Sequence, residues 1–378
     1  MIHLELYKYK LTWFQLLTVF CTVILFSVSI TEKNYWFLII TTPFYVCLIF
    51  LKTSVFQWLN IGILIGISLL IIYFIPPLSL KFLNQFLEKK TQFFYLRKIL
   101  MIFIESRYSS DSASFIEMLL FNFRNQNSYQ LLRQINSLNI GYLFVVSGFH
   151  ISLLLNLISR IFCLKKRPFF RDFCGFCFTV IYGYFLGYSI GILRICLNLL
   201  FRVLFRVKDN IILNCWSGLI IGFCFNQELN NLGYLMTFLC SIYINFLMKY
   251  LSGHKFALSM LISLGCFFIT LPMVLKISPK INVYFLLLNY LYSALIPFIY
   301  SYLLLTFYLP RFNVWNTQII TGIIRLIHMN LAVSSFVYFS KISNYYSVLY
   351  YFALEAVFFP IFFWKEKKLQ KNYKNNIN

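Results

Sequence analysis

The sequence predicts an all-α, polytopic integral membrane protein with about twelve transmembrane helices and an interfacial amphipathic segment. Two features of the composition support this fold class, because 60% of the 378 residues are hydrophobic and only 12% are charged. A water-soluble domain carries about twice that share of charged residues. A third observation is the repetition of uncharged stretches of about 20 residues, the length that a helix needs to cross a hydrocarbon core of ~30 Å.

Residues 1–80 are predicted to form the N-terminal transmembrane helices. LTWFQLLTVFCTVILFSVSI (11–30) and YWFLIITTPFYVCLIFL (35–51) contain no charged residue, and a third uncharged run extends from Thr53 to Leu80. The first run is too long for the core of a cleavable signal and lacks a small-residue cleavage site. We therefore expect it to be a membrane span.

Residues 81–140 differ from this block because charged residues return in a helical rhythm. In KFLNQFLEKKTQFFYLRKILMIFIESR (81–107), apolar residues recur at intervals of three and four with Lys and Arg between them. The turn-rich RYSSDSAS (107–114) then interrupts the pattern. We interpret residues 81–140 as an amphipathic segment that lies at the membrane interface on the extracellular side.

Residues 141–364 are predicted to contain about nine further spans, followed by a basic cytoplasmic tail at 365–378. Short basic loops alternate with nearly uncharged ones, which indicates a multi-pass protein of the plasma membrane with both termini in the cytoplasm. The chain has 33 Lys and Arg against 11 Asp and Glu, a net charge of +22 that suits nucleic acid or anionic lipid as a partner. The predicted spans are 141–163, 173–191, 192–207, 211–227, 232–248, 256–275, 283–308, 313–339 and 344–364.

The ten cysteines and four histidines do not form a metal-binding pattern. Cys174 and Cys177 make a single CGFC pair, and a zinc site would need a second such pair or clustered histidines. Most of the other cysteines fall in predicted spans, where a thiol behaves as a small hydrophobe. We expect no metal and no cofactor.

FVVSGFHISLL (144–154) places a serine, a glycine and a histidine in an apolar predicted helix. Ser147 and His150 share a helix face, and Gly148 lets a neighbouring backbone approach closely. Two interpretations stay open: a packing notch in which Ser147 bonds to its own backbone, or the lining of a pathway. A catalytic serine would need a GxSxG turn and an acidic partner, and because neither is present we do not expect an enzyme.

Gly187, Gly191, Arg194 and Asn198 are spaced by four, three and four residues, which is typical of one helix face. An arginine deep in a span costs ~2.5 to 3.5 kcal/mol on insertion scales and is seldom kept without a partner or a wet cavity. We therefore predict that this stripe lines a pathway or binds a ligand. Snorkelling of Arg194 from a helix end is the alternative.

A second polar set lies near the C-terminus. Arg325 and Glu355 fall on consecutive predicted spans at similar distances from the loop between them, and His328 follows Arg325 by three residues. We predict an intramembrane ion pair between Arg325 and Glu355 whose role is to hold two helices together.

Several of these motifs together resemble the competence region of ComEC-type proteins, inner-membrane channels for single-stranded DNA. SGFH matches the SG-x-H signature of that family, and Arg194 occupies the arginine of its R-A-x-x-M motif, where this chain has Ile195 and Asn198. TLP (270–272) with Asn289 downstream follows the spacing of a third sequence block of that family. Longer family members also carry an OB-fold and a metallo-β-lactamase-like domain, neither of which has a counterpart in the motifs of this sequence.

The resemblance implies import of single-stranded DNA across the membrane during competence and natural transformation. It assigns the DNA pathway to Ser147, Gly148, His150, Gly187, Gly191, Arg194, Asn198 and Asn289. Because the sequence has no G-x-x-x-x-G-K-[ST] loop, the expected partners besides single-stranded DNA and the lipid bilayer are a cytosolic ATP-driven helicase or translocase and a separate nuclease or DNA receptor. A homodimer is one assembly to test. The alternative function is a transporter or flippase of a phosphate-bearing lipid or lipid-linked sugar.

Overall fold

The structure is a computed structural model that describes residues 93–338, apart from short gaps at 124, 145–147, 162–166, 226–231, 251–254 and 278–279. It also describes the isolated residues 23, 79, 81, 83–85 and 350. The predicted N-terminal spans, the 344–364 span and the basic tail lie almost wholly outside the described residues.

The described part of the chain is mostly helical, as predicted for an all-α protein. Each predicted span from 173–191 to 313–339 overlaps mainly one helix, the predicted span 141–163 contains two, and the amphipathic segment contains three more. In chain order the elements are α6 (Phe93–Glu105), α7 (Ser110–Phe121), α8 (Gln126–Ser137), α9 (Gly141–Phe144), α10 (Gly148–Ile161), α11 (Pro168–Leu186), α12 (Ile190–Phe205), α13 (Asn210–Cys224), α14 (Leu232–Tyr250), α15 (Lys255–Ile277), β1 (Lys280–Asn282), α16 (Phe285–Thr306), the 3-10 helix η3 (Pro310–Phe312), α17 (Asn313–Val333) and β2 (Phe336–Tyr338).

Helix ends follow local chemistry. The helix α11 begins at Pro168, whose fixed φ suits the first turn, and it ends before Gly187, which has a φ of 75° that favours glycine. The side chain of Asp209 accepts a hydrogen bond from the backbone amide of Ile211 and so caps α13. Asn125 caps α8 in the same way, through the amide of Ser128. These caps divide the hydrophobic block into separate helices.

The expected number of transmembrane helices is not confirmed. Among the described helices, α11 with 19 residues and α16 with 22 are long and apolar enough to cross a bilayer by length and composition. The helices α10 and α12 have only 14 and 16 residues, short of the ~20 that a span requires. The predicted span 141–163 is longer than α10 because Gly141–Phe144 belongs to the separate short helix α9.

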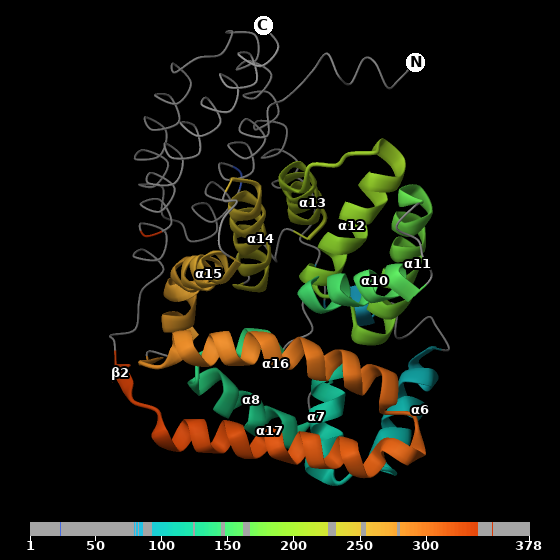
Figure 1. The fold of residues 1–378 in the computed structure, drawn as a ribbon. Coiled ribbons are helices and arrows are strands. Elements are labelled where there is room, and N and C mark those ends of the chain that lie inside the picture. Colours follow the sequence, from blue (N-terminus) through green and yellow to red (C-terminus); the bar gives the residue numbers. More distant parts are fainter. Residues whose placement is uncertain are drawn as a thin grey trace, which may run out of the picture.

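The helices form two groups in Figure 1. In one group, η3 connects α16 to α17, α7 packs against both of these helices, and α8 packs against α17. In the other group, α11 packs on α12, and α13, α14 and α15 follow as successive neighbours. The helix α10 contacts α11 and α12 of the second group as well as α16 of the first, so it lies where the two groups meet.

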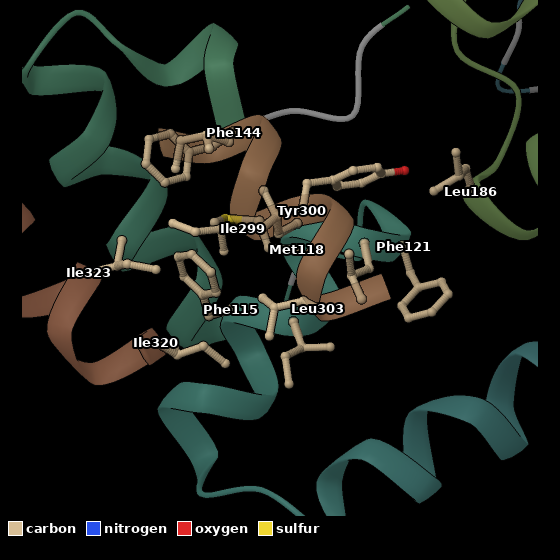
Figure 2. Packing of buried hydrophobic residues seen from close by; sticks show 14 of the residues in the cluster. Phe115, Met118, Phe121, Phe144, Leu186, Ile299, Tyr300, Leu303, Ile320 and Ile323 are labelled. Atoms are coloured by element: carbon tan, nitrogen blue, oxygen red, sulfur yellow. The ribbon is translucent and has the colours of Figure 1, made fainter. Parts of the chain in front are cut away.

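The main hydrophobic core is centred on α7. Ten of its twelve residues are buried, and its apolar side chains pack against α16 and α17 (Figure 2). The core residues Phe115 and Met118 come from α7, Leu303 from α16, and Ile320 and Ile323 from α17. By contrast, α6 exposes apolar residues and α8 exposes polar ones, so the three helices of the predicted amphipathic segment have different surroundings.

Buried polar groups tie both ends of α16 to the rest of this group. Near its C-terminal end, the Tyr108 hydroxyl donates to the carbonyl of Phe307 at 2.9 Å, and Asn316 of α17 donates to that hydroxyl at 3.0 Å. Before its N-terminal end, the amide of Asn282 donates to the side chain of Asn139 at 2.6 Å. There β1 pairs antiparallel with β2, and Lys280 lies opposite Tyr338.

A carboxyl group is enclosed in this core. Glu117 of α7 is fully buried; its Oε2 accepts a hydrogen bond of 3.0 Å from Asn125, and its Oε1 has no hydrogen-bond partner among the described residues. Burial raises the pKa of Glu117 to about 7, with the carboxylate of Glu105 adding to the rise and the bond from Asn125 opposing it. The side chain therefore takes up a proton when the core forms below neutral pH.

We predict that Glu117→Gln removes a pH dependence of stability. In the unfolded chain Glu117 titrates near its ordinary pKa of 4.5, and in the folded chain near 7. Between these two values the folded state binds a proton that the unfolded chain does not. The contribution of this group to the stability is therefore fully present below about pH 4.5 and is lost as the pH rises through about 7, by on the order of 3 kcal/mol. Thermal unfolding between pH 4.5 and 8 measures this.

Asp111→Asn is the matched control, because Asp111 is an exposed carboxyl on the same helix. It should keep the wild-type decline in stability. A Glu117→Gln protein that loses stability over this pH range as steeply as the wild type contradicts the assignment.

Candidate functional site

The described part of the SGFH motif lies at the start of α10. Ser147 falls outside the described residues, and Gly148 is the first residue of α10. His150 follows in the first turn, is 2% exposed and packs its ring against Tyr300 of α16, with the ring centroids 4.6 Å apart. The motif thus places a buried imidazole at the junction of α10 and α16.

Tyr300 connects His150 to a chain of buried hydroxyl groups. Its hydroxyl lies 2.6 Å from that of Tyr182 on α11. Tyr182 in turn donates to the carbonyl of Leu120 on α7 at 2.9 Å, so it accepts from Tyr300. Neither hydroxyl is left without a partner, as burial requires. One side-chain cluster therefore joins α7, α10, α11 and α16.

The predicted glycine and arginine stripe lies mainly on α12. Gly191 is buried in the first turn, and Arg194 donates from Nη1 to the carbonyl of Thr237 on α14 at 2.6 Å. Asn198 donates from Nδ2 to the Oδ1 of Asn214 on α13 at 2.9 Å. The stripe therefore faces α13 and α14.

Gly187 is not part of this helix face. It occupies the turn between α11 and α12, where its positive φ would strain any other residue type. Asn84 holds this turn through two bonds, donating from Nδ2 to the carbonyl of Tyr188 at 3.2 Å and accepting from the Tyr188 amide at 2.9 Å. Gly187 thus positions the start of α12.

The interior of the α12–α14 packing has one cation and no compensating anion among the described residues. The Nε of Arg194 and the Oδ1 of Asn198 are both buried and have no hydrogen-bond partner in the described part of the chain. The salt bridge found in that part joins Arg171 to Asp172 at 2.9 Å, at the far end of α11. A partly buried guanidinium whose Nε is buried without a partner favours an anionic ligand, because desolvation of the charge is then compensated.

The predicted pathway residues lie at separate positions on adjoining helices. Asn289 is 5% exposed on α16 and precedes Tyr300, the residue that contacts His150, by eleven residues, or ~16 Å of helix. Arg194 and Asn198 face α14 and α13. The helix α10 packs on both α16 and α12.

Of the predicted ion pair between Arg325 and Glu355, Glu355 lies outside the described residues. Arg325 is exposed on α17. His328, one turn further on, lies 3.0 Å from the Oε1 of Gln134 on α8 through its Nε2. The ion pair stays a prediction.

Four residues of these clusters were not anticipated from the sequence. Asn214 had a usable signal, because a polar side chain in an apolar helix needs a partner. Tyr182 and Tyr300 had none, since the chain contains 27 tyrosines. Thr237 contributes its backbone carbonyl, which no side-chain pattern reveals.

Comparison with known proteins gives two kinds of result. The Competence protein family model matches residues 119–368. The uncharacterized protein MG316 of Mycoplasma genitalium is 28% identical over 327 residues, which cover 80% of this chain and 84% of that protein. The MG316 homolog of Mycoplasma pneumoniae is 27% identical over 216 residues, or 56% of each chain. No solved structure matches.

We predict that Tyr182→Phe destabilises the fold more than Tyr300→Phe. Loss of the Tyr182 hydroxyl deprives both Tyr300 and the Leu120 carbonyl of a partner, at a cost of about 1–3 kcal/mol, whereas loss of the Tyr300 hydroxyl leaves the Tyr182 donor satisfied. The melting temperature is measured with a thiol-specific fluorophore, whose fluorescence rises when heating exposes the buried Cys196 and Cys215.

Tyr308→Phe controls for removal of a tyrosine hydroxyl, because Tyr308 is 50% exposed. It should melt like the wild type. Equal melting temperatures for Tyr182→Phe and Tyr308→Phe would show that the buried hydroxyl chain contributes nothing.

Proposed function

The chain belongs to the Competence protein family, and on that premise we propose that it is a membrane channel through which single-stranded DNA enters the cell during competence. Family membership supports a role in DNA uptake. The two long apolar helices α11 and α16 are consistent with a membrane location. The observation that carries the channel proposal is the uncompensated guanidinium of Arg194.

Arg194 suits a phosphodiester group. Its Nη1 is fixed by the carbonyl of Thr237, so the planar guanidinium is oriented before a ligand arrives, and its Nε still has a proton to donate. Arginine forms charge-assisted, often bidentate bonds with phosphate oxygens. Each nucleotide of a single strand carries one phosphate, so successive phosphates can occupy the same position as the strand advances.

The residues around His150 position the helices that surround the proposed pathway. Tyr300 and Tyr182 hold α10 against α11 and α16, and α10 packs on α12, the helix that carries Arg194. We assign the SGFH residues Ser147, Gly148 and His150, together with Asn289, to shaping the helices around the pathway. Contact with DNA falls to the stripe of Gly191, Arg194 and Asn198.

Transport of DNA needs an energy source outside this chain. Moving a negative charge into a negative-inside cell costs ~2.3 kcal/mol per 100 mV. The sequence has no phosphate-binding loop for ATP. We therefore propose that a cytosolic ATP-driven helicase or translocase pulls the strand and that a separate nuclease or DNA receptor delivers it, while this chain performs no catalysis itself.

We predict that Arg194→Gln lowers DNA uptake at least tenfold, because a hydrogen bond to a charged group contributes about 1.5–3 kcal/mol. Uptake of labelled DNA is measured in a deletion strain complemented with wild-type, Arg194→Gln or Arg194→Lys chains. The lysine variant keeps the charge but loses the planar fork, so it should recover part of the uptake. Immunodetection in the membrane fraction controls for the amount of protein.

Arg206→Gln is the matched control, because Arg206 caps the end of the same helix and is exposed. Its uptake should equal that of the wild type. Normal transformation of the deletion strain would overturn the proposed function and favour the alternative, transport of a phosphate-bearing lipid, which the same guanidinium could bind.

A further inference from the structure

A second cationic region lies on the outside of the molecule, where α8 packs on α17. Arg133 of α8 and Arg325 of α17 are both exposed. His328 meets Gln134 across the two helices at 3.0 Å. We call this region the α8–α17 surface, and it comprises Tyr129, Gln130, Arg133, Gln134, Arg325 and His328.

The residues of this surface come from two stretches of the sequence that contain no acidic residue. Neither 118–171 nor 229–354 includes an aspartate or a glutamate, so no acidic side chain occurs on α8, on α17 or on the paired strands β1 and β2. The helix α7, which also packs on α8, carries two acidic residues. Glu117 is buried in the core, and Asp111 lies in the first turn of α7.

Asp111 lies near one end of the α8–α17 surface. The side chain of Asn127 donates to Ser110 at 2.7 Å, which places the start of α8 beside the start of α7. Arg133 is six residues further along α8, or ~9 Å at 1.5 Å per residue. The potential over the middle of the surface is therefore set by its cations.

The outward face of α8 carries groups that bind nucleic acid. Its inward face packs Leu131 and Ile135 into the core, so the opposite face must be exposed. That face carries Tyr129, which is 50% exposed, and Arg133 one helical turn later. An exposed aromatic ring beside an arginine offers a base-stacking surface and a phosphate contact together.

We propose that the α8–α17 surface binds single-stranded DNA and gathers the strand before it reaches Arg194. This inference rests on the proposed function and extends it to a site outside the helix bundle. Arg133 and Arg325 contact phosphates, Tyr129 stacks on a base, and the amides of Gln130 and Gln134 supply hydrogen bonds that do not depend on sequence.

An anionic membrane fits this surface less well. A helix that binds lipid inserts an apolar face into the headgroup region, and the apolar face of α8 is already occupied by the protein core. The helix α6 shows the contrast, because it exposes Leu96, Ile99 and Ile102, which are 46%, 60% and 55% exposed.

The test measures binding of a fluorescent oligothymidylate to the full chain in nanodiscs of zwitterionic lipid, by anisotropy at several salt concentrations. Removing two phosphate contacts in the double variant Arg133→Gln/Arg325→Gln should weaken binding at least tenfold and reduce the slope of log K against log salt by ~1.4. Tyr129→Ala should weaken binding about tenfold with the slope unchanged, because stacking releases no counterions.

Arg311→Gln and Tyr308→Ala provide matched controls, since both residues are exposed at the turn between α16 and α17, outside this surface. They should bind the oligonucleotide like the wild type. A parallel measurement uses vesicles that contain phosphatidylglycerol. If the double variant loses vesicle binding but keeps its affinity for the oligonucleotide, the surface is a membrane contact and the proposal is overturned.

The two proposals fail in different ways. Unchanged oligonucleotide affinity in the surface variants, or no binding by the wild type, discards the α8–α17 surface even when the deletion strain has lost DNA uptake. Normal uptake in the deletion strain discards the channel whatever the oligonucleotide affinities are.

Discussion

The hydroxyl group of Tyr182 is the link on which the arrangement of the helices depends. Tyr182 belongs to α11 and contacts Tyr300 of α16 and Leu120 of α7, so it joins the α7–α16–α17 core to the helices that carry the candidate site. In an apolar interior a hydroxyl must find partners or destabilise the fold, and the geometry that satisfies all three groups is narrow. The position of α12, and with it Arg194, is fixed through its packing on α10 and α11.

Much of the helix arrangement could be predicted from the sequence, and the tertiary partners could not. Long apolar runs placed the helices approximately, because hydrophobicity acts locally, but the predicted span 173–191 ran through Gly187, where α11 ends. The sequence also singled out Arg194, whose cost in an apolar helix is independent of its neighbours. Its bond to the carbonyl of Thr237, and the burial of α7 in the core, depend on residues far along the chain and on backbone atoms that carry no sequence signal.

The two cationic regions differ in physical character. Arg194 is a single charge between helices, where the low dielectric makes one contact with an anion strong and insensitive to salt. The α8–α17 surface presents several charges to water, where each contact is weak and is screened over about 10 Å at 0.1 M salt. In the proposed channel, a strand would therefore be held loosely at the α8–α17 surface and firmly at Arg194, so its affinity would rise along the route.

The bond between Tyr108 and Asn316 spans 208 residues of the chain, and this separation has a consequence for biosynthesis. A ribosome that adds about 5–20 residues per second needs roughly 10–40 seconds to travel that distance. During this interval the apolar face of α7 exists without α16 and α17, and a neighbouring protein or the lipid surface must shield it. The core that α7 organises is thus among the last parts of the molecule to close, although α7 is made early.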